Sequence, residues 1–221
     1  MSLIVKICGL STRETLDVAL DAGADMVGFV SFPPSPRHIG LGAMRDLGDA
    51  VKGRARKVAL SVDADDETLA NVVEALKPDM LQLHGNETTA RVRDVKQMFR
   101  VPVMKVLAVE TSDDLARVPG YAAVADMILF DARAPKDATR PGGLGVPFDW
   151  HLLETLDCPV PFLVSGGLDA DNVAEALRVI GNAAGVDVSS GVERASGIKD
   201  SDKIRAFIRA ARAATPTATV A

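Results

Sequence analysis

Short apolar runs alternate with helix-like stretches about eight times along the chain, and this alternation limits the possible fold more than any other feature. The runs are rich in Val, Ile, Leu, Met and Phe, which is the composition of parallel strands buried on both faces. The strands expected on this basis are Ile4–Cys8, Met26–Val30, Lys57–Val62, Asp79–His84, Pro102–Leu107, Asp126–Asp131, Pro161–Ser165 and Val186–Ser189.

The stretches between these runs place apolar residues at helical spacing. In the first of them a Ser or Thr can cap the helix, Leu16 and Leu20 share one face, and Gly23 stands where a glycine commonly ends a helix. The helices expected in this way are Thr12–Ala22, Thr68–Leu76, Ala90–Phe99, Asp171–Ile180 and Asp202–Ala213.

Eight alternating units in a chain of 221 residues favour an α/β fold with a single (β/α)8 TIM barrel, whose usual size is about 200 to 250 residues. The rival fold is an open doubly wound sheet, which usually carries a Gly-x-Gly-x-x-Gly turn after its first strand. Here that turn reads Cys-Gly-Leu-Ser-Thr. We therefore expect one barrel domain over residues 1–213 and a flexible C-terminal tail over residues 214–221.

Composition excludes several classes of function. The net charge is −5 and no basic run is present, which argues against a nucleic-acid-binding surface. No stretch approaches the roughly 20 apolar residues of a membrane span, and the first residues lead straight into a strand without room for a signal peptide. The two cysteines, Cys8 and Cys158, are not spaced as a disulfide framework or a metal knuckle. We expect a cytoplasmic protein without membrane or nucleic-acid partners.

The active site of such a barrel lies at the C-terminal ends of its strands. Cys8 ends the first strand, next to Gly9. A cysteine is often only a small buried hydrophobe, the role that Cys158 keeps. For Cys8, local electrostatics of about 2 kcal/mol would lower the pKa from about 8.5 to near 7, which would make it a proton-abstracting base.

Asp131 ends the sixth strand and precedes a long loop, Ala132–Pro147, that includes Gly142 and Gly143. An aspartate there could be no more than a turn or helix-cap residue. Loops of this length in a compact domain are usually lids or binding loops, however. Under a lid, a partly desolvated Asp131 could hold a proton and donate it as a catalytic acid.

Two glycine-rich turns follow the seventh and eighth strands. They contain Ser165, Gly166 and Gly167 in one turn and Ser189, Ser190 and Gly191 in the other. Backbone N–H groups near helix N-termini bind phosphate, and in TIM barrels these two loops often form the phosphate site. We therefore expect a phosphorylated small molecule as substrate.

Strand geometry adds two expectations about the barrel interior. If Cys8 points inward, Lys6 does too, because alternate residues of a strand share a face. In a closed barrel the eighth strand lies beside the first, so Asp187 would face Lys6. This predicts a buried ion pair between Lys6 and Asp187. His84 shares an inward face with Gln82. A metal site would need about three converging ligands, and the third strand supplies no histidine. We expect His84 to hydrogen-bond substrate or neighbours, with no metal.

With these residues placed, the chain resembles the phosphoribosylanthranilate isomerase family along almost its whole length. The ordered motifs that carry the resemblance are Lys6-Ile7-Cys8-Gly9-Leu10, Ala22-Gly23-Ala24-Asp25, Gly28-Phe29-Val30, Ser35-Pro36-Arg37, Gln82-Leu83-His84-Gly85, Gly142-Gly143-Leu144-Gly145, Phe148-Asp149-Trp150, Gly166-Gly167-Leu168 and Val186-Asp187-Val188-Ser189-Ser190-Gly191-Val192-Glu193. Leu144 and Ser165 depart from it, because the family usually has Thr or Ser at the first position and a small apolar residue at the second.

The resemblance implies a TIM barrel of the ribulose-phosphate-binding type that performs an Amadori rearrangement in tryptophan biosynthesis. Asp131 would protonate the furanose ring oxygen, and Cys8 would remove the C2 proton of the resulting imine, with no cofactor. Arg37 would bind the anthranilate carboxylate through its fork of donors, rather than being a solvated loop cation. His84, Gly142, Gly143, Asp187 and the glycine-rich turns would line the substrate site.

Two other functions remain open at this level. A two-substrate relative would also isomerise the aminoaldose of the histidine pathway, although such enzymes have an aspartate where this chain has Cys8. A phosphate-binding barrel without catalysis is the third candidate. In each case the chain would be a monomer or a homodimer.

Overall fold

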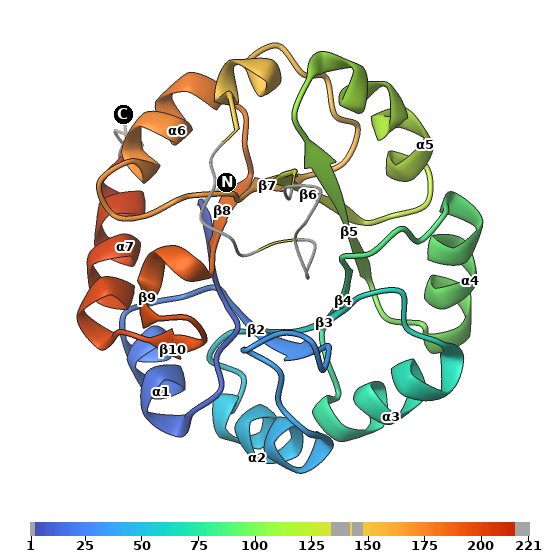
Figure 1. Cartoon of the computed structure of the whole chain (residues 1–221), viewed down its shortest axis with the longest axis vertical. Helices are drawn as coiled ribbons and strands as arrows, with labels where there is room; N and C mark the ends of the chain where they lie inside the picture. The colour runs from blue at the N-terminus through green and yellow to red at the C-terminus, as the bar shows by residue number, and fades with distance from the viewer. Residues whose placement is uncertain (1–2, 134–141, 143–147, 215–221) are drawn as a thin grey trace, which may run out of the picture.

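The computed structural model describes residues 3–133, 142 and 148–214, and these form a closed barrel surrounded by helices (Figure 1). The barrel has eight parallel strands in chain order, and β8 pairs with β1. The strands are β1 Ile4–Cys8, β2 Met26–Ser31, β3 Arg56–Ser61, β4 Met80–Leu83, β5 Val103–Val109, β6 Met127–Ala132, β7 Phe162–Val164 and β8 Gly185–Val188. Closure between β8 and β1 confirms the predicted TIM barrel and rules out the open sheet.

Helices form the outer layer around this barrel. The α-helices are α1 Arg13–Asp21, α2 Leu41–Val51, α3 Asp66–Leu76, α4 Thr89–Phe99, α5 Val118–Ala122, α6 Val173–Ile180 and α7 Ser201–Ala213. Three 3-10 helices are η1 Ser112–Arg117, η2 Trp150–Leu153 and η3 Ser190–Val192, and a two-stranded hairpin consists of β9 Glu193–Ala195 and β10 Ile198–Lys199. The described residues include no helix long and apolar enough to cross a membrane.

Capping explains where the expected helices begin and end. Thr12 caps α1 as predicted, by accepting a hydrogen bond from the backbone N–H of Thr15, and Gly23 adopts φ +91° just after the helix. Helix α3 begins earlier than expected, because the Asp65 side chain accepts from the N–H of Thr68 and so places Thr68 inside the first turn. Helix α6 begins later than expected, at Val173.

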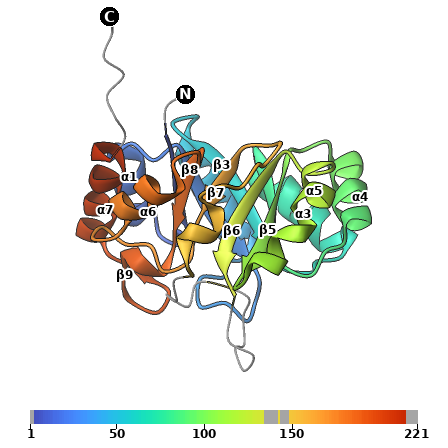
Figure 2. The same ribbon diagram turned by 90° about the horizontal axis from the view of Figure 1, so that it is seen from above.

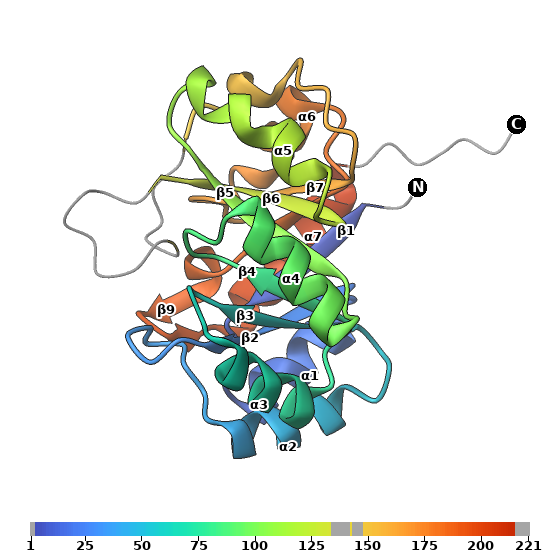
Figure 3. The same ribbon diagram turned by 90° about the vertical axis from the view of Figure 1, so that its right-hand side faces the viewer.

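Several elements were absent from the sequence prediction, among them the 3-10 helices η1 and η2. Helix α2 contains Gly42 and Gly48, which obscure the helical pattern, and α5 is a short helix with Pro119 in its first turn. The β9–β10 hairpin lies between β8 and α7. Figures 2 and 3 show this hairpin at the opposite end of the barrel from the start of β1, so it stands at the C-terminal rim of the strands.

Apolar side chains fill the barrel below that rim. The interior cluster is rich in methionine, whose flexible side chain fills irregular space, and contains Met26, Val58, Met80, Met104, Val106, Met127, Leu129 and Leu163. A larger cluster packs the outer faces of the strands against the helices. Because the interior is packed rather than open, chemistry is confined to the C-terminal rim.

Residues 215–221, which make up nearly all of the expected C-terminal tail, lie outside the described part of the chain. Ala214, the first residue of that segment, is described and caps α7 through a hydrogen bond from its N–H to Ala210 O.

Replacing Gly185 with alanine should destabilise the barrel at its closing seam. A β-carbon at this position would overlap the backbone oxygen of Ile4 on β1, and backbone cannot move aside as a side chain can. We expect Gly185→Ala to lower the free energy of unfolding by about 1–3 kcal/mol in urea titrations.

The matched control is Gly42→Ala in α2, where a β-carbon would meet nothing within 4 Å. This substitution should raise the free energy of unfolding by about 0.4–1 kcal/mol, because alanine reduces the conformational freedom of the unfolded chain. Equal effects of the two substitutions would contradict the tight seam between β8 and β1.

Candidate active site

Cys8 lies at the end of β1 with its sulfur in a confined, largely apolar space. The residue is 3% exposed and lies in one apolar cluster with Val30 of β2 and Leu60 of β3. On β2, a β-carbon at Gly28 would lie 2.9 Å from the sulfur. The glycine thus allows the sulfur to pack directly against the backbone of β2.

Below Cys8 the predicted ion pair between Lys6 and Asp187 is confirmed. The two residues are register partners on β1 and β8, and the Lys6 Nζ atom lies 2.7 Å from Asp187 Oδ1. The Lys6 side chain is 0% exposed and that of Asp187 is 7% exposed. Burial alone would lower the pKa of Lys6, but Asp187 and then Cys8 outweigh it, so the pKa is raised and the lysine stays charged.

The expectation that the pKa of Cys8 falls toward 7 is wrong for the structure without substrate. Burial raises the pKa of the Cys8 thiol above its usual value, and Lys6 and Lys199 only partly oppose this effect. The physical reason is that Asp187 neutralises Lys6 at close range and itself disfavours a nearby thiolate. In this state Cys8 therefore rests mainly as a thiol.

Asp131 lies on the same rim, because it is in the last part of β6 and all eight strands run parallel. It is 6% exposed, and its Oδ1 atom accepts a hydrogen bond of 3.0 Å from the N–H of Ala132. A β-carbon at Gly142 would lie 2.5 Å from Asp131 Oδ2, and one at Gly166 would lie 3.2 Å from Oδ1. Glycines therefore pack against both oxygens of this carboxyl group.

His84 follows β4 and faces Asp131. Its Nε2 atom lies 3.3 Å from Asp131 Oδ2, and its Nδ1 atom lies 3.5 Å from the Gln82 amide nitrogen. A β-carbon at Gly142 would also come within 2.7 Å of His84 Nε2. The structure thus brings His84, Asp131 and Gly142 together, as the sequence led us to expect, while Gly143 lies outside the described residues.

A buried ion pair that the sequence reading missed holds the loop that carries His84. Lys105 on β5 places its Nζ atom 2.7 Å from Glu87 Oε2 and also donates to the backbone oxygens of Leu83 and Gly85. Glu87 in turn accepts from the N–H of Gly85 at 2.9 Å. A lysine in the middle of the apolar run Val103–Leu107 was the signal that could have revealed this contact.

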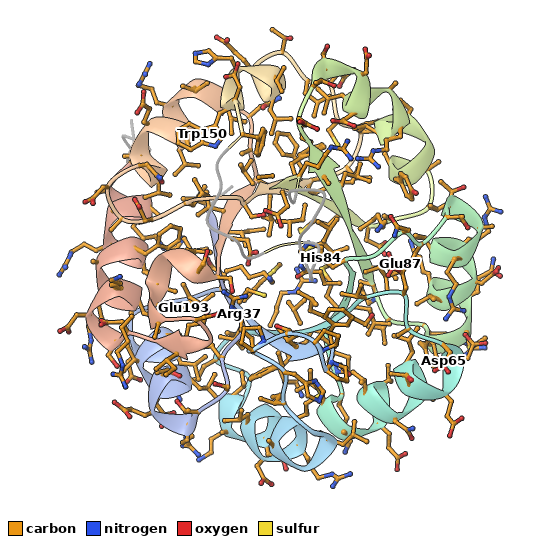
Figure 4. The ribbon with its side chains drawn as sticks, viewed as in Figure 1. Arg37, Asp65, His84, Glu87, Trp150 and Glu193 are labelled. Carbon is orange, nitrogen blue, oxygen red and sulfur yellow. The ribbon has the colours of Figure 1, made fainter. Side chains whose placement is uncertain are left out.

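Arg37 is not a solvated loop cation. Its Nε and Nη2 atoms donate to the two carboxylate oxygens of Glu193 at 2.6 and 2.9 Å, and both side chains are buried (Figure 4). Its aliphatic stem lies on the backbone next to Cys8, since a β-carbon at Gly9 would lie 2.6 Å from Arg37 Cδ. The structure therefore brings Arg37 to the rim beside Cys8, with a partner in Glu193 that we had not predicted.

The two glycine-rich loops meet each other at the rim. A β-carbon at Gly191 would overlap the backbone oxygen of Leu168, and Gly166 and Gly167 adopt φ of +83° and +65°. Within the described residues, the backbone N–H groups of Gly166, Gly167, Ser190 and Gly191 have no protein acceptor. Four such donors on adjoining loops suit an anion.

The helices beside these loops differ from the prediction. The 3-10 helix η3 starts at Ser190, as expected for the second loop. The first loop does not lead directly into a helix, because Asp169 accepts from the N–H groups of Asp171 and Asn172 and forms a turn before α6. Ser189 points to the first strand, where its Oγ atom donates to Cys8 O at 3.2 Å.

Histidine, cysteine and acidic side chains do not gather as a metal-ligand set in the parts of the chain that the structure describes. Cys158, in the loop before β7, is half-buried and, like Cys8, forms no disulfide. Its pKa is raised by burial.

A closed (β/α)8 barrel with a thiol, a carboxyl group, an arginine and two glycine-rich loops at its C-terminal rim has the layout of a barrel enzyme for a small anionic substrate. The sequence pattern of the N-(5'phosphoribosyl)anthranilate (PRA) isomerase family matches residues 5–210. The chain belongs to this family.

Relatives and solved structures agree with this assignment. The chain is 73% identical over 213 residues to the N-(5'-phosphoribosyl)anthranilate isomerase of Bradyrhizobium diazoefficiens, covering 96% of this chain and 95% of that protein. It is 65% identical to the enzyme of the same name from Rhodopseudomonas palustris strain HaA2, covering 99% and 100%. The crystal structure of phosphoribosyl anthranilate isomerase from Thermotoga maritima superimposes with a TM-score of 0.86 at 33% identity, covering 96% of this chain and 99% of that one.

Lys6→Met should destabilise the protein strongly, because it leaves the Asp187 carboxylate buried without its partner. We expect a loss of about 3–5 kcal/mol in the free energy of unfolding, measured by urea titration at pH 7. The pKa of Lys6 is raised on folding, so its contribution is fully present below the unfolded value of about 10.4 and is lost only as the pH rises through the folded value.

Two controls accompany this measurement. Lys52→Met removes an exposed lysine just after α2 and should change stability by no more than about 0.5 kcal/mol. The double variant Lys6→Met/Asp187→Leu should be more stable than Lys6→Met, because no lone buried charge remains. If Lys6→Met were as stable as Lys52→Met, the Lys6–Asp187 ion pair would contribute nothing to the free energy of unfolding.

Proposed function

We propose that Cys8 and Asp131 are the base and the acid with which this chain, an isomerase of the phosphoribosylanthranilate family, carries out its Amadori rearrangement. The reaction converts N-(5'-phosphoribosyl)anthranilate to 1-(2-carboxyphenylamino)-1-deoxyribulose 5-phosphate, a step of tryptophan biosynthesis. The observation that carries the assignment of roles is the position of two nearly buried proton-transfer groups at the ends of β1 and β6, on one rim of the barrel.

The first step opens the sugar. The carboxyl group of Asp131 gives its proton to the furanose ring oxygen as the bond from C1 to that oxygen breaks, and the nitrogen lone pair forms a protonated C1=N imine. His84 Nε2, 3.3 Å from Asp131 Oδ2, is placed to stabilise the carboxylate that remains. Gly142, which packs against both groups, would contact the sugar beside them, and Gly143 stays a prediction.

The second step removes the C2 proton. The Cys8 thiolate takes this proton, the C2–H electrons form the C1=C2 bond, and the imine electrons return to nitrogen, which gives an enolamine. Loss of the C2 hydroxyl proton and protonation of C1 then give the ketose. The positive imine next to C2 favours a nearby thiolate, which offsets the burial that raises the pKa of Cys8 in the free protein.

The two anionic groups of the substrate would find separate donors on the rim. Arg37 would bind the anthranilate carboxylate, and the N–H groups of Gly166, Gly167, Ser190 and Gly191 would bind the phosphate. Ser189 and Asp187 would complete the wall near C2. A related isomerase structure, 31% identical, is a complex with reduced 1-(o-carboxyphenylamino)-1-deoxyribulose 5-phosphate, a compound with both anionic groups.

The setting of the enzyme is part of the same proposal. We place it in the cytoplasm as one domain over residues 1–213, as a monomer or a homodimer, with the sugar phosphate as its only partner and no cofactor. The protonated imine supports the last point, because its positive charge next to C2 makes that proton acidic enough for a side-chain base.

Phosphoribosylanthranilate is fluorescent, so its decay on adding the protein tests the activity directly. We expect wild-type protein to consume it and both Cys8→Ala and Asp131→Asn to reduce kcat by at least about 100-fold while staying folded. The matched control is Cys158→Ala, which should turn over like the wild type.

Other outcomes would change the assignment. Wild-type rates in either variant would remove that residue from the mechanism. No decay with wild-type protein would favour a barrel that only binds phosphate. Conversion of the histidine-pathway aminoaldose as well would indicate a two-substrate enzyme.

The pH dependence of Cys8 alkylation should report the ionisation of this thiol directly. Because burial raises the pKa of the thiol, the thiolate is a minor species at neutral pH, and its fraction grows about tenfold per pH unit below that pKa. We expect the rate of alkylation by iodoacetamide, in a Cys158→Ser background, to rise about tenfold per pH unit between about pH 7 and 8.5. A flat rate over this range would show that the thiolate already predominates at pH 7, against the effect of burial.

A further inference from the structure

The β9–β10 hairpin carries two buried charges that the proposed mechanism does not use. Glu193 stands at the start of β9 and Lys199 at the end of β10, and their side chains are 5% and 1% exposed. The Lys199 Nζ atom lies 2.9 Å from Glu193 Oε1. Buried charges are costly unless they are well paired, so this pair calls for an explanation.

Glu193 faces Arg37. It accepts the bidentate pair of hydrogen bonds from the guanidinium, and the N–H of Gly197 in the hairpin turn donates to its Oε2 atom at 3.1 Å. The turn also packs on the segment before Arg37, since a β-carbon at Gly197 would lie 2.5 Å from Pro36 O. The hairpin thus fixes both the backbone and the side chain of Arg37.

Lys199 faces Cys8. Its Nζ atom donates to Ser189 O at 2.8 Å and to Ser189 Oγ at 3.2 Å, and the same Oγ atom donates to Cys8 O. A continuous set of hydrogen bonds therefore runs from the hairpin to the residue proposed as the base. Electrostatically, Lys199 lowers the pKa of the Cys8 thiol, against the larger effect of burial.

We propose that Glu193 and Lys199 are positioning residues for two different parts of the substrate site: Glu193 orients Arg37 toward a carboxylate, and Lys199 stabilises the Cys8 thiolate. This inference rests on the proposed function of Arg37 and Cys8. It assigns the hairpin, which follows the last barrel strand, to both substrate selection and proton abstraction.

The charges around Cys8 explain why a second lysine matters. From β1 and β8 the thiol faces Lys6 and Asp187, which neutralise each other at 2.7 Å. From β2 and β3 it faces Gly28, Val30 and Leu60, which do not titrate. Beyond this pair, the charge of Lys199 also acts on the thiol. Lys199 and Arg37 are both paired with Glu193. Two cations and one anion leave this group with a positive charge that favours a thiolate.

The test measures the ionisation of the Cys8 thiol without turnover. In a Cys158→Ser background, the rate at which iodoacetamide alkylates Cys8 is followed by mass spectrometry at a series of pH values. Lys199→Met removes a positive charge and should raise the pKa of the Cys8 thiol by about one unit. At pH values below this pKa, alkylation should then be about tenfold slower. Glu193→Gln removes a negative charge and should speed alkylation about threefold. If the two residues had a purely structural role, the two substitutions would not change the alkylation rate in opposite directions.

Steady-state kinetics provide the second measurement. Glu193→Gln should raise KM about fivefold without lowering kcat, because Arg37 loses its charged partner while the Cys8 thiolate is not disfavoured. Lys199→Met should instead lower kcat about tenfold with KM within about twofold, and Lys199→Arg should restore most of the loss.

Lys203→Met is the matched control. Lys203 is exposed on α7 and contacts the same hairpin, through Glu193 O at 2.8 Å. It should leave alkylation and kinetics unchanged. Thermal melting of every variant separates these effects from unfolding.

The outcomes distinguish this inference from the proposed function. Opposite alkylation shifts in a protein that does not consume phosphoribosylanthranilate would support the hairpin's effect on Cys8 and overturn the isomerase mechanism. Turnover by the wild type with alkylation shifts of the same sign, or with none, would overturn the hairpin proposal alone.

Discussion

The buried ion pair between Lys6 and Asp187 is the interaction on which the arrangement of the rim depends. It joins the first and last strands of the barrel, directly below Cys8. Two charges in a packed interior are tolerated only because they meet at hydrogen-bond distance. Because Lys6 and Asp187 largely neutralise each other, burial is the main influence on the pKa of the Cys8 thiol. The charge that Lys199 of the hairpin adds therefore matters more for this pKa.

Hydrogen-bonded pairs hold several of the polar residues at the rim. Lys105 and Glu87 hold the loop of His84, Glu193 holds Arg37, and Ser189 joins β8 to the backbone of Cys8. Each pair links an end of one strand or its loop to another. The rim is therefore a connected set of polar contacts above a floor of apolar side chains, and this preorganisation suits a reaction that moves protons between fixed positions.

The fold could be predicted because parallel strands buried on both faces leave a simple apolar signal, and because Lys6 and Asp187 obey strand parity across a closed seam. The hairpin could not be predicted, since Glu193–Ala195 and Ile198–Lys199 are too short for a periodic pattern. The partners of Arg37 and Lys105 depend on contacts between distant segments. The resting state of Cys8 was misjudged because the cost of burying a thiolate is not visible in the order of residues.

Gly28 has a consequence for stereochemistry. Because Gly28 has no β-carbon, the sulfur of Cys8 packs directly against β2, and Val30 and Leu60 pack against Cys8 as well. As the proposed base, Cys8 is thus held on one wall of the barrel and would reach a sugar carbon from a single face. Of two epimers that differ at that carbon, only the one whose hydrogen turns toward that wall would present it to the sulfur, so a single glycine would help to set the handedness of the substrate that reacts.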